Sequence, residues 1–486
     1  MNKTIKLKTV LIALLVLVVV GAGILTPIIS NYQNQITELK ESLDDKGVAT
    51  DFEKPNTSTD AEFKKFYEVY DLLINKHRQK IVTQELVDGA IEGMIAALDD
   101  PYTTYMNAEE AKQFAEQMEG EYQGIGAGLY EENGKVIIEY TFKDSPAERA
   151  GVLSGDVIVE VDGEDVTEFS TAEIIGVVRG DKGTEVTIGF ARPGVAETVY
   201  IVIVRDTIPL LTVEHRILDV EDQRMGYLEI SRVGEKTFSE VAAALTDMGE
   251  LDSLVIDVRG NPGGYLHIIQ QITNLFVGNS LPYIQIEDRN GNVEKYFVQH
   301  TKLDYPIAVL IDGNSASAAE IFAAAVNQIE DIPLVGKKTF GKGTVQTQNL
   351  FSDGSSIKYT IQKFLSPNGE WFHGIGVSPT HEVDQPEFYG FYKVSIIEDV
   401  TENIYNQQIL NAEKILDVLG YDIVVDGFLD DDTMTEIGKF QKDNDLKVTN
   451  TLTQEVASQL NTLIKAMIED DANDAQLQKA IELLSE

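Results

Sequence analysis

The chain has 486 residues, more than one hydrophobic core usually organises, so we expect roughly two to four domains. Its 80 acidic and 39 basic side chains give a formal net charge of −41, which repels phosphate backbones and argues against nucleic-acid binding. Cysteine is absent, which excludes a thiolate nucleophile, thiolate metal sites and disulfides.

The N-terminus has the pattern of a membrane anchor. Three early lysines precede a nearly unbroken apolar run from Val10 to Ile29, about one bilayer crossing in length. Positive charge before the span predicts that the body of the chain lies outside the cytoplasm. We therefore expect residues 1–30 to be a retained single-pass transmembrane anchor in the cell membrane, and the polar residues 31–60 to be a linker. A cleaved signal peptide is the alternative, although the run is long for an h-region and lacks a clear A-x-A site.

The next two regions differ in their hydrophobic period. Residues 61–118 show helical periodicity, with one apolar stripe from Phe63 to Leu73, and are predicted to be a helical segment. Between 119 and 206 the period changes to two, as in the run Val157–Val161 before the turn at Asp162 and Gly163. This second region is predicted to be a small β-rich domain.

The remaining chain divides into a mixed region and a helical one. From 207 to 390 short β-rich runs alternate with helical patterns, which predicts an α/β core with its chemistry at the carboxyl ends of strands. Residues 391–404 are expected to be a linker. Residues 405–468 read as a small all-α domain, and residues 469–486 as an acidic tail.

The most reactive-looking stretch is Asn314–Phe322, which reads NSASAAEIF. A serine hydroxyl needs an adjacent base, and none of the six scattered histidines is near this serine pair. Lys342, in the glycine-flanked run TFGKGTVQ, is the candidate base. Lowering a lysine pKa from about 10.4 to near 7 requires roughly 4 kcal/mol of environmental bias, which burial must largely supply. The neutral amide of Gln346 could orient the amine without stabilising its charge.

The same run can also be compared with a phosphate-binding loop. Residues 336–342 fit G-x-x-x-x-G-K, but a phosphate loop needs Ser or Thr at the next position, where this chain has Gly343. The nucleotide-binding alternative is therefore disfavoured.

Taken together, SASAAEIF followed by TFGKGTVQ resembles the carboxyl-terminal processing peptidases, also called tail-specific proteases, over roughly residues 61 to 390. The resemblance implies a ClpP/crotonase-like α/β serine protease core. It implies that Ser317 is the nucleophile, that Lys342 is the base and that Gln346 holds the lysine. Ser315 is then a structural serine that caps a helix or turn.

Amide cleavage also needs donors for the developing oxyanion, commonly backbone N–H groups at a helix start or a glycine loop. Ala318 follows the nucleophile at a predicted helix N-terminus. Residues Asp257–Gly264 are similar to the family's D-x-R-x-N-x-G-G segment, which implies that Gly263 or Gly264 supplies a second donor. A simple tight turn is the alternative for this segment.

The β-rich region contains GIGA, SPAERAGVLSGDVIVEVDG and RGDKGT in an order that resembles a PDZ domain of the bacterial protease-associated type. PDZ domains bind C-terminal tails by strand addition, with backbone N–H groups around the carboxylate. The resemblance implies that this cradle is formed by Gly124, Ile125, Gly126 and Ala127. Arg179 matches an arginine that couples tail binding to the dyad in some relatives, and a turn-anchoring role is the alternative.

Residues 419–453 resemble the small peptidoglycan-binding domain of many envelope enzymes, although Gly438 and Asn450 stand where that pattern more often has Ala and Gly. An uncommitted three-helix accessory domain is the alternative. LDDPYTTYM and HGIGVSPTHEV extend the peptidase resemblance, with Thr380 replacing the usual Asp.

These observations predict a membrane-anchored extracytoplasmic serine endopeptidase that captures protein C-terminal tails and cuts within the tail region through an acyl-enzyme. The mechanism needs no metal or organic cofactor. The competing hypothesis is a catalytically silent scaffold that tethers partners through its PDZ and wall-binding domains. The physiological substrate is not readable from the residues, and homo-oligomerisation is left open.

Overall fold

The computed structural model describes residues 59–132, 134–220, 223–298, 303, 305–396, 399–400 and 405–485. The predicted membrane anchor and nearly all of the linker after it lie outside these residues. Among the helices that are described, none is long and apolar enough to cross a bilayer.

The chain divides into two compact units, Met1–Ala90 and Ile91–Glu486. The first contains α2 (Thr59–Lys76) and the first part of α3 (Thr83–Ala96). Helix α2 has the predicted apolar stripe, but Phe63 and other large apolar residues on it are exposed. The apolar stripe of α2 therefore does not mark a helix that is buried in a core.

A six-stranded sheet in the order β10-β11-β12-β15-β16-β19 forms the centre of the second unit. Its strands are β10 (Val213–Val220), β11 (Gln223–Ile230), β12 (Ser253–Asp257), β15 (Ile307–Ile311), β16 (Leu334–Gly336) and β19 (His381–Glu382). Only β10 and β11 pair antiparallel, and every other neighbouring pair is parallel. Strands β12 and β15 are buried along their whole length, because both faces of a parallel sheet are covered.

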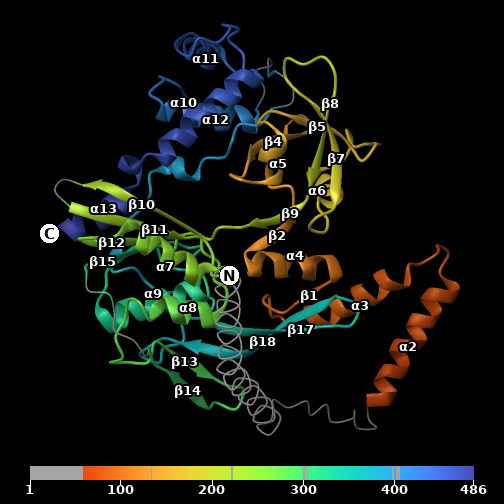
Figure 1. Cartoon of the computed structure of the whole chain (residues 1–486), viewed down its shortest axis with the longest axis vertical. Coiled ribbons are helices and arrows are strands. Elements are labelled where there is room, and N and C mark those ends of the chain that lie inside the picture. Colours follow the sequence, from red (N-terminus) through yellow and green to blue (C-terminus); the bar gives the residue numbers. More distant parts are fainter. Residues whose placement is uncertain are drawn as a thin grey trace, which may run out of the picture. The chain divides into compact units, whose positions relative to one another are not determined.

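Helices cover both faces of this sheet (Figure 1). On one face pack α7 (Thr237–Met248), α8 (Leu266–Thr273) and α9 (Ala318–Glu330). On the other face packs α13 (Ala475–Ser485), whose Leu477 and Ala480 are buried against Tyr227 and Val255. The region expected to be an acidic tail thus contains a helix that covers the core, because an apolar stripe runs along α13.

A second sheet has the order β1-β18-β13-β14, with β17 also paired to β18. Its strands are β1 (Thr104–Met106), β13 (Ile284–Glu287), β14 (Val293–Tyr296), β17 (Thr344–Leu350) and β18 (Ser356–Leu365). Strand β1 lies in the segment predicted to be helical. It has only three residues and pairs with a strand some 250 positions later, as in Thr104 opposite Lys358, so no local period could reveal it. Helix α4 (Ala108–Glu119) follows it directly.

The β-rich domain is a sheet of order β3-β4-β5-β7-β8 with β6 on β5. Its elements are β3 (Ala127–Glu132), β4 (Lys135–Thr141), α5 (Pro146–Ala150), β5 (Val157–Val161), β6 (Glu164–Asp165), α6 (Thr171–Val178), β7 (Glu185–Ala191) and β8 (Val199–Val204). The chain enters and leaves this domain through an antiparallel pair, β2 (Glu121–Gly124) and β9 (Asp206–Pro209). The domain has its own apolar core, to which Ile138, Ile158 and Phe190 contribute.

The C-terminal helical domain also has a separate apolar core. Its elements are η1 (Glu387–Gly390), α10 (Gln407–Val418), α11 (Asp431–Asp443), α12 (Gln454–Glu469) and η2 (Asp471–Asn473). A Cβ added at Gly438 would lie 2.3 Å from Asn450 Oδ1, so the two departures from the family pattern compensate each other. The coarse prediction of a multidomain α/β protein with a β-rich and a C-terminal helical domain is confirmed.

Candidate active site

Five of the predicted site residues line one cavity of about 560 Å³. They are Ser317, Lys342, Gln346, Gly263 and Gly264. The two glycines follow β12, Ser317 follows β15, and the other two lie at the start of β17. The cavity therefore sits at the carboxyl edge of the central sheet, where the second sheet meets it. Helix α4 adds Phe114 and Met118 to its wall, and β18 adds Lys358.

Ser317 has an unusual backbone and little exposure. It is the N-cap residue of α9, with φ 55° and ψ −112°, and is 8% exposed. A positive φ is rare for a residue with a Cβ and persists only where the surroundings enforce it, which is common at functional sites. The chain thus turns sharply at this serine, and its side chain reaches the cavity.

Glu320 is a functional residue that the sequence reasoning missed. It is fully buried, and its carboxylate accepts the N–H of Ser317 (2.9 Å) and the N–H of Lys342 (2.7 Å) on Oε2. On Oε1 it accepts the N–H of Gly341 (2.7 Å) and the hydroxyl of Thr339 (2.6 Å). One carboxylate therefore joins the nucleophile's backbone to the lysine loop. The signal was available, because Ser317 and Glu320 have the S-x-x-E spacing of a capping box.

Ser315 makes structural contacts in a turn, which is one of the two roles expected of it. Its Oγ donates to the carbonyl of Val258 (2.8 Å) and accepts from the N–H of Asp312 (3.0 Å). Its carbonyl accepts the N–H of Phe340 (3.0 Å). Fully buried, Ser315 connects the loop after β12 to the loop after β15.

Lys342 lies half-buried beside the ring of Tyr102. Its Nζ is 5.3 Å from the centre of the Tyr102 ring, and within the described ranges it forms no hydrogen bond or ion pair. Burial lowers the pKa of Lys342 below the usual lysine value, and the charge of Lys358 lowers it further. Glu320 and Asp100 act in the opposite direction, and the net pKa shift is downward. This is the direction that a lysine base requires.

Gln346 is not engaged with the lysine in this structure. Its Nε2 donates to the hydroxyl of Thr344 (2.8 Å) and to that of Thr360 (3.3 Å). Because Gln346 and Lys342 line the same cavity, a rotation of the glutamine side chain is the change that would bring them together.

The loop after β12 lies directly on Ser317, the predicted nucleophile. A Cβ added at Gly263 would be 2.7 Å from Ser317 Cβ and 2.8 Å from the amide nitrogen of Ala318, so only glycine fits. The N–H of Gly263 donates to Asn261 Oδ1 (2.8 Å). In the part of the chain that the structure describes, the N–H groups of Gly264 and Ala318 have no acceptor, as expected for Ala318 at the first turn of a helix.

The predicted carboxylate cradle borders a second, smaller cavity in the β-rich domain. This cavity has a volume of about 120 Å³ and is lined by Gly124, Ile125 and Ala127, with Ile175 and Val178 of α6 facing them. The wall is apolar apart from Tyr122 and Arg179. Gly126 is not part of the lining but belongs to the same turn, with φ 77°.

Arg179 leaves its own turn and contacts a helix that borders the active-site cavity. Its Nη1 is 2.8 Å from Glu116 Oε2 on α4, and its guanidinium lies 4.7 Å from the ring centre of Tyr122. Helix α4 also carries Phe114 and Met118 of the active-site wall. The arginine therefore connects the small cavity of the β-rich domain with the wall of the larger one.

The structure also bears on metal binding. No group of three or more His, Asp and Glu side chains that could hold a metal ion occurs in the described part of the chain.

Comparison with known proteins identifies several parts of the chain. The model of peptidase family S41 matches residues 224–383, and that of the activating protease CtpB N-terminal domain matches residues 18–110. A PDZ domain model matches residues 138–192, and a putative peptidoglycan binding domain model matches residues 405–460.

Relatives that align with most of the chain carry names that agree with the peptidase family model. The carboxy-terminal processing protease CtpB of Bacillus subtilis is 37% identical over 433 residues, covering 88% of this chain and 90% of that protein. CtpA of the same organism is 35% identical, covering 89% and 92%. A probable CtpA-like serine protease of Staphylococcus haemolyticus is 31% identical over 98% of this chain and 94% of that protein. The resemblance found in the sequence is confirmed: the chain belongs to peptidase family S41, the carboxy-terminal processing serine proteases.

Proposed function

We propose that the protein is a membrane-anchored, extracytoplasmic endopeptidase that uses Ser317 and Lys342 as a catalytic dyad. The observation that carries the proposal is the shared cavity at the edge of the sheet, which is lined by a strained, buried serine and by a lysine of lowered pKa. Among the residues that the structure describes, Lys342 has no ion pair that would make it purely structural. Family membership supports the same reaction class.

In the proposed reaction the neutral Lys342 amine accepts the proton of the Ser317 hydroxyl as its oxygen attacks the scissile carbonyl. The resulting ammonium returns that proton to the leaving amine when the C–N bond breaks, which leaves an acyl-enzyme. The lysine then takes a proton from water, whose oxygen attacks the ester, and gives it back to the serine. No metal or organic cofactor takes part.

The oxyanion is assigned to two backbone donors. The N–H of Ala318 is free at the start of α9, and of the two predicted glycines Gly264 has the free N–H, whereas Gly263 donates to Asn261. One such donor is typically worth about 3 to 4 kcal/mol of transition-state stabilisation. Gly263 then contributes through its lack of a side chain, which lets the loop lie against Ser317.

The arrangement around Lys342 is that of a resting enzyme. Gln346 must leave Thr344 and Thr360 before it can hold the lysine amine. Arg179 is the candidate for coupling this change to substrate capture, because it lies at the groove of the PDZ domain and binds Glu116 on α4.

The accessory regions are assigned by the same reasoning. The groove beside Gly124–Ala127 is proposed to receive the C-terminal tail of a protein substrate by strand addition. The apolar run Val10–Ile29 is proposed to anchor the chain in the cell membrane with its catalytic body outside the cytoplasm. The helical domain at 405–460 is proposed to bind peptidoglycan.

The full-length protein, solubilised in detergent, provides the test. Peptides with apolar C-termini are incubated with the wild type, with Ser317→Ala and with Lys342→Ala, and fragments are identified by mass spectrometry. We expect cleavage by the wild type only, while all three proteins bind the tail peptides equally. Cleavage that survives Ser317→Ala contradicts the dyad. Tail binding without any cleavage by the wild type supports the silent scaffold instead.

A further inference from the structure

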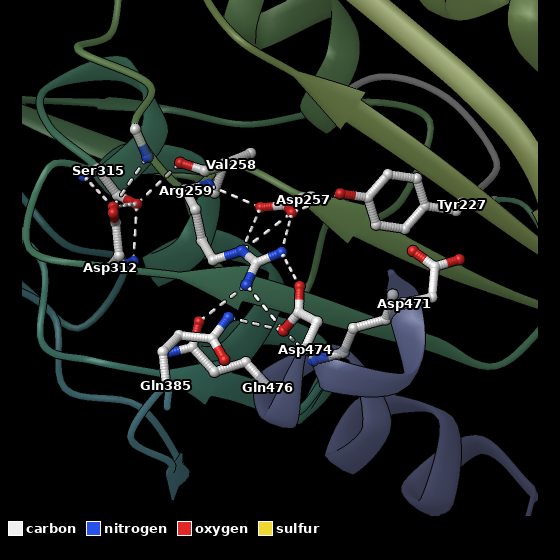
Figure 2. Close-up of polar contacts among 12 residues, drawn as sticks. Tyr227, Asp257, Val258, Arg259, Asp312, Ser315, Gln385, Asp471, Asp474 and Gln476 are labelled. Carbon is white, nitrogen blue, oxygen red and sulfur yellow. Dashed lines mark hydrogen bonds and ion pairs between the residues drawn. The ribbon is translucent and has the colours of Figure 1, made fainter. Parts of the chain in front are cut away.

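A charged network of low exposure lies at the end of β12, around the start of the Asp257–Gly264 loop (Figure 2). Its centre is Arg259, which follows β12 and is five residues before Gly264. The guanidinium contacts both carboxylate oxygens of Asp257, with Nη2 2.6 Å from Oδ2. Tyr227 donates its hydroxyl to the same Asp257 oxygen at 2.6 Å.

The other half of the network comes from the C-terminal segment. Arg259 Nη2 donates to Asp474 Oδ2 (2.7 Å) and Nη1 donates to Asp474 Oδ1 (3.1 Å), so this pair is bidentate. Arg259 Nη1 also donates to Gln476 Oε1 at 3.0 Å. The side chains of Arg259 and Asp474 are only 17% and 11% exposed. Arginine is suited to such a planar, two-pronged contact, which fixes direction as well as distance.

Asp474 is itself held firmly. It accepts the side-chain amide of Gln385 (2.7 Å) and the N–H of Leu477 (2.9 Å) in the first turn of α13. Burial acts to raise the pKa of Asp474, but the hydrogen bonds and charge of Arg259 outweigh it and the pKa is lowered. The carboxylate is thus ionised at neutral pH and joins α13 to the core.

From Arg259 the contacts continue to the nucleophile. The N–H of Gly260 donates to Asp312 Oδ1 (2.9 Å). The carbonyl of Asn261 accepts the N–H of Ala316 (2.8 Å), next to Ser317, and its side chain accepts the N–H of Gly263. Arg259 therefore belongs to a short loop whose other end contacts Ser317 and presents the free N–H of Gly264.

The geometry points to Asp474 as a positioning residue for the oxyanion loop, acting through Arg259, so that the C-terminal segment Asp471–Ser485 is part of the peptidase. This inference rests on the proposed roles of Ser317 and Gly264. Without the Asp474 charge, Arg259 keeps Asp257, which belongs like itself to the β12 end and its loop, and from the C-terminal segment only the neutral side chain of Gln476. The charged, two-pronged contact with the other face of the sheet is then lost.

The test compares two single variants of the full-length protein. Asp474→Asn removes the charge that holds Arg259 but keeps the size of the side chain. Asp471→Asn is the matched control, because Asp471 lies in the same C-terminal segment as Asp474 and also pairs with an arginine. Its partner is Arg216 on β10 (2.6 Å), which is not part of the Asp257–Gly264 loop. At a temperature where circular dichroism shows all proteins folded, we measure kcat, KM, tail-peptide affinity and inhibition by a peptide boronate, which forms a tetrahedral adduct with the serine.

For Asp474→Asn we expect kcat to fall by about 10- to 100-fold, the loss typical of a small misplacement of a catalytic group. Boronate affinity should weaken in parallel, while KM and tail-peptide affinity stay within about twofold. Asp471→Asn should match the wild type. In a double-mutant cycle with Arg259→Gln, the second change should add little to the first.

Two results would overturn the inference: unchanged kcat and boronate affinity in folded Asp474→Asn, or equal losses in Asp471→Asn. Failure of the proposed dyad is recognised separately, because it would appear as cleavage by Ser317→Ala, whatever Asp474→Asn does.

Discussion

The serine half and the lysine half of the site are built differently. Ser317 and Gly263 are buried, and their loops are held by hydrogen bonds of Ser315, Asn261 and Glu320. The lysine side chain lies beside the Tyr102 ring and forms no hydrogen bond or ion pair with a described residue, and Gln346 hydrogen-bonds to Thr344 and Thr360 instead. The comparison indicates that the backbone around Ser317, the proposed nucleophile, is held in place, whereas the side chain of Lys342, the proposed base, has not formed the contact proposed to orient it.

The strongest way to break this contrast is Glu320→Gln, because Glu320 joins the two halves. In this variant an amide NH2 group would replace one carboxylate oxygen, and each of these oxygens accepts two hydrogen bonds. Two donors of the surrounding loops would then face another donor. We expect kcat to fall by at least about 100-fold and the free energy of unfolding to fall by about 1 to 3 kcal/mol for each unpaired donor.

Steady-state kinetics and urea unfolding check this expectation. Glu110→Gln is the control, since Glu110 holds the same capping-box position at the start of α4 but is exposed. If both variants behave alike, Glu320 does not have the linking role.

A second disruption is confined to the serine half. In Gly263→Ala the new methyl group would meet Ser317 Cβ at 2.7 Å, at a φ of +95° that alanine tolerates poorly. We expect a loss of kcat of about 100-fold with tail-peptide binding unchanged.

Gly176→Ala is its control, because nothing lies within 4 Å of a Cβ there and the residue is helical, so the variant should be as stable as the wild type or slightly more so. Full activity of Gly263→Ala would show that the loop is free to move away from the nucleophile.

Gln346→Ala tests the lysine half of the site. Among the described residues the Gln346 side chain hydrogen-bonds only to Thr344 and Thr360, so we expect the melting temperature to change little. We expect kcat to fall by about tenfold, because the lysine loses its proposed orienting partner. Differential scanning fluorimetry and peptide cleavage measure the two effects. A large loss of stability with normal kcat would contradict this assignment.

The smallest expected effect is a pH shift. The charged or titratable groups that face Lys342 are Lys358 on β18, Glu320 on α9, and Asp100 and Tyr102 before β1. Because the base acts when deprotonated, activity should rise with pH through the pKa of Lys342. Removing the charge of Lys358 in Lys358→Met lets that pKa rise, so the rising limb of kcat/KM should move to higher pH.

At alkaline pH, kcat/KM of Lys358→Met should reach the same plateau as that of the wild type. This result would separate an electrostatic effect from a packing defect. Lys363→Met on the same strand is the control, since Lys363 pairs with Glu287 and does not line the cavity. A shift to lower pH in Lys358→Met would be the opposite of the prediction.

The sequence by itself determined the chemistry-bearing motifs and their order. The family's serine, lysine and glutamine, its glycine segment and the GIGA turn were found because each is a contiguous pattern, and the structure brings the dyad, the glutamine and the glycine pair into one cavity. The alternation of strands and helices predicted the α/β core, since buried parallel strands read as continuous apolar runs.

Tertiary structure alone decided how these pieces are supported. Strand β1 exists only because a distant strand pairs with it, and the C-terminal helix covers the sheet although its composition looks like a charged tail. The contact between Arg259 and Asp474 spans more than 200 positions, and no local pattern selects one carboxylate among 80 acidic residues. Such contacts depend on which surfaces meet after folding, and that is a property of packing rather than of neighbouring residues.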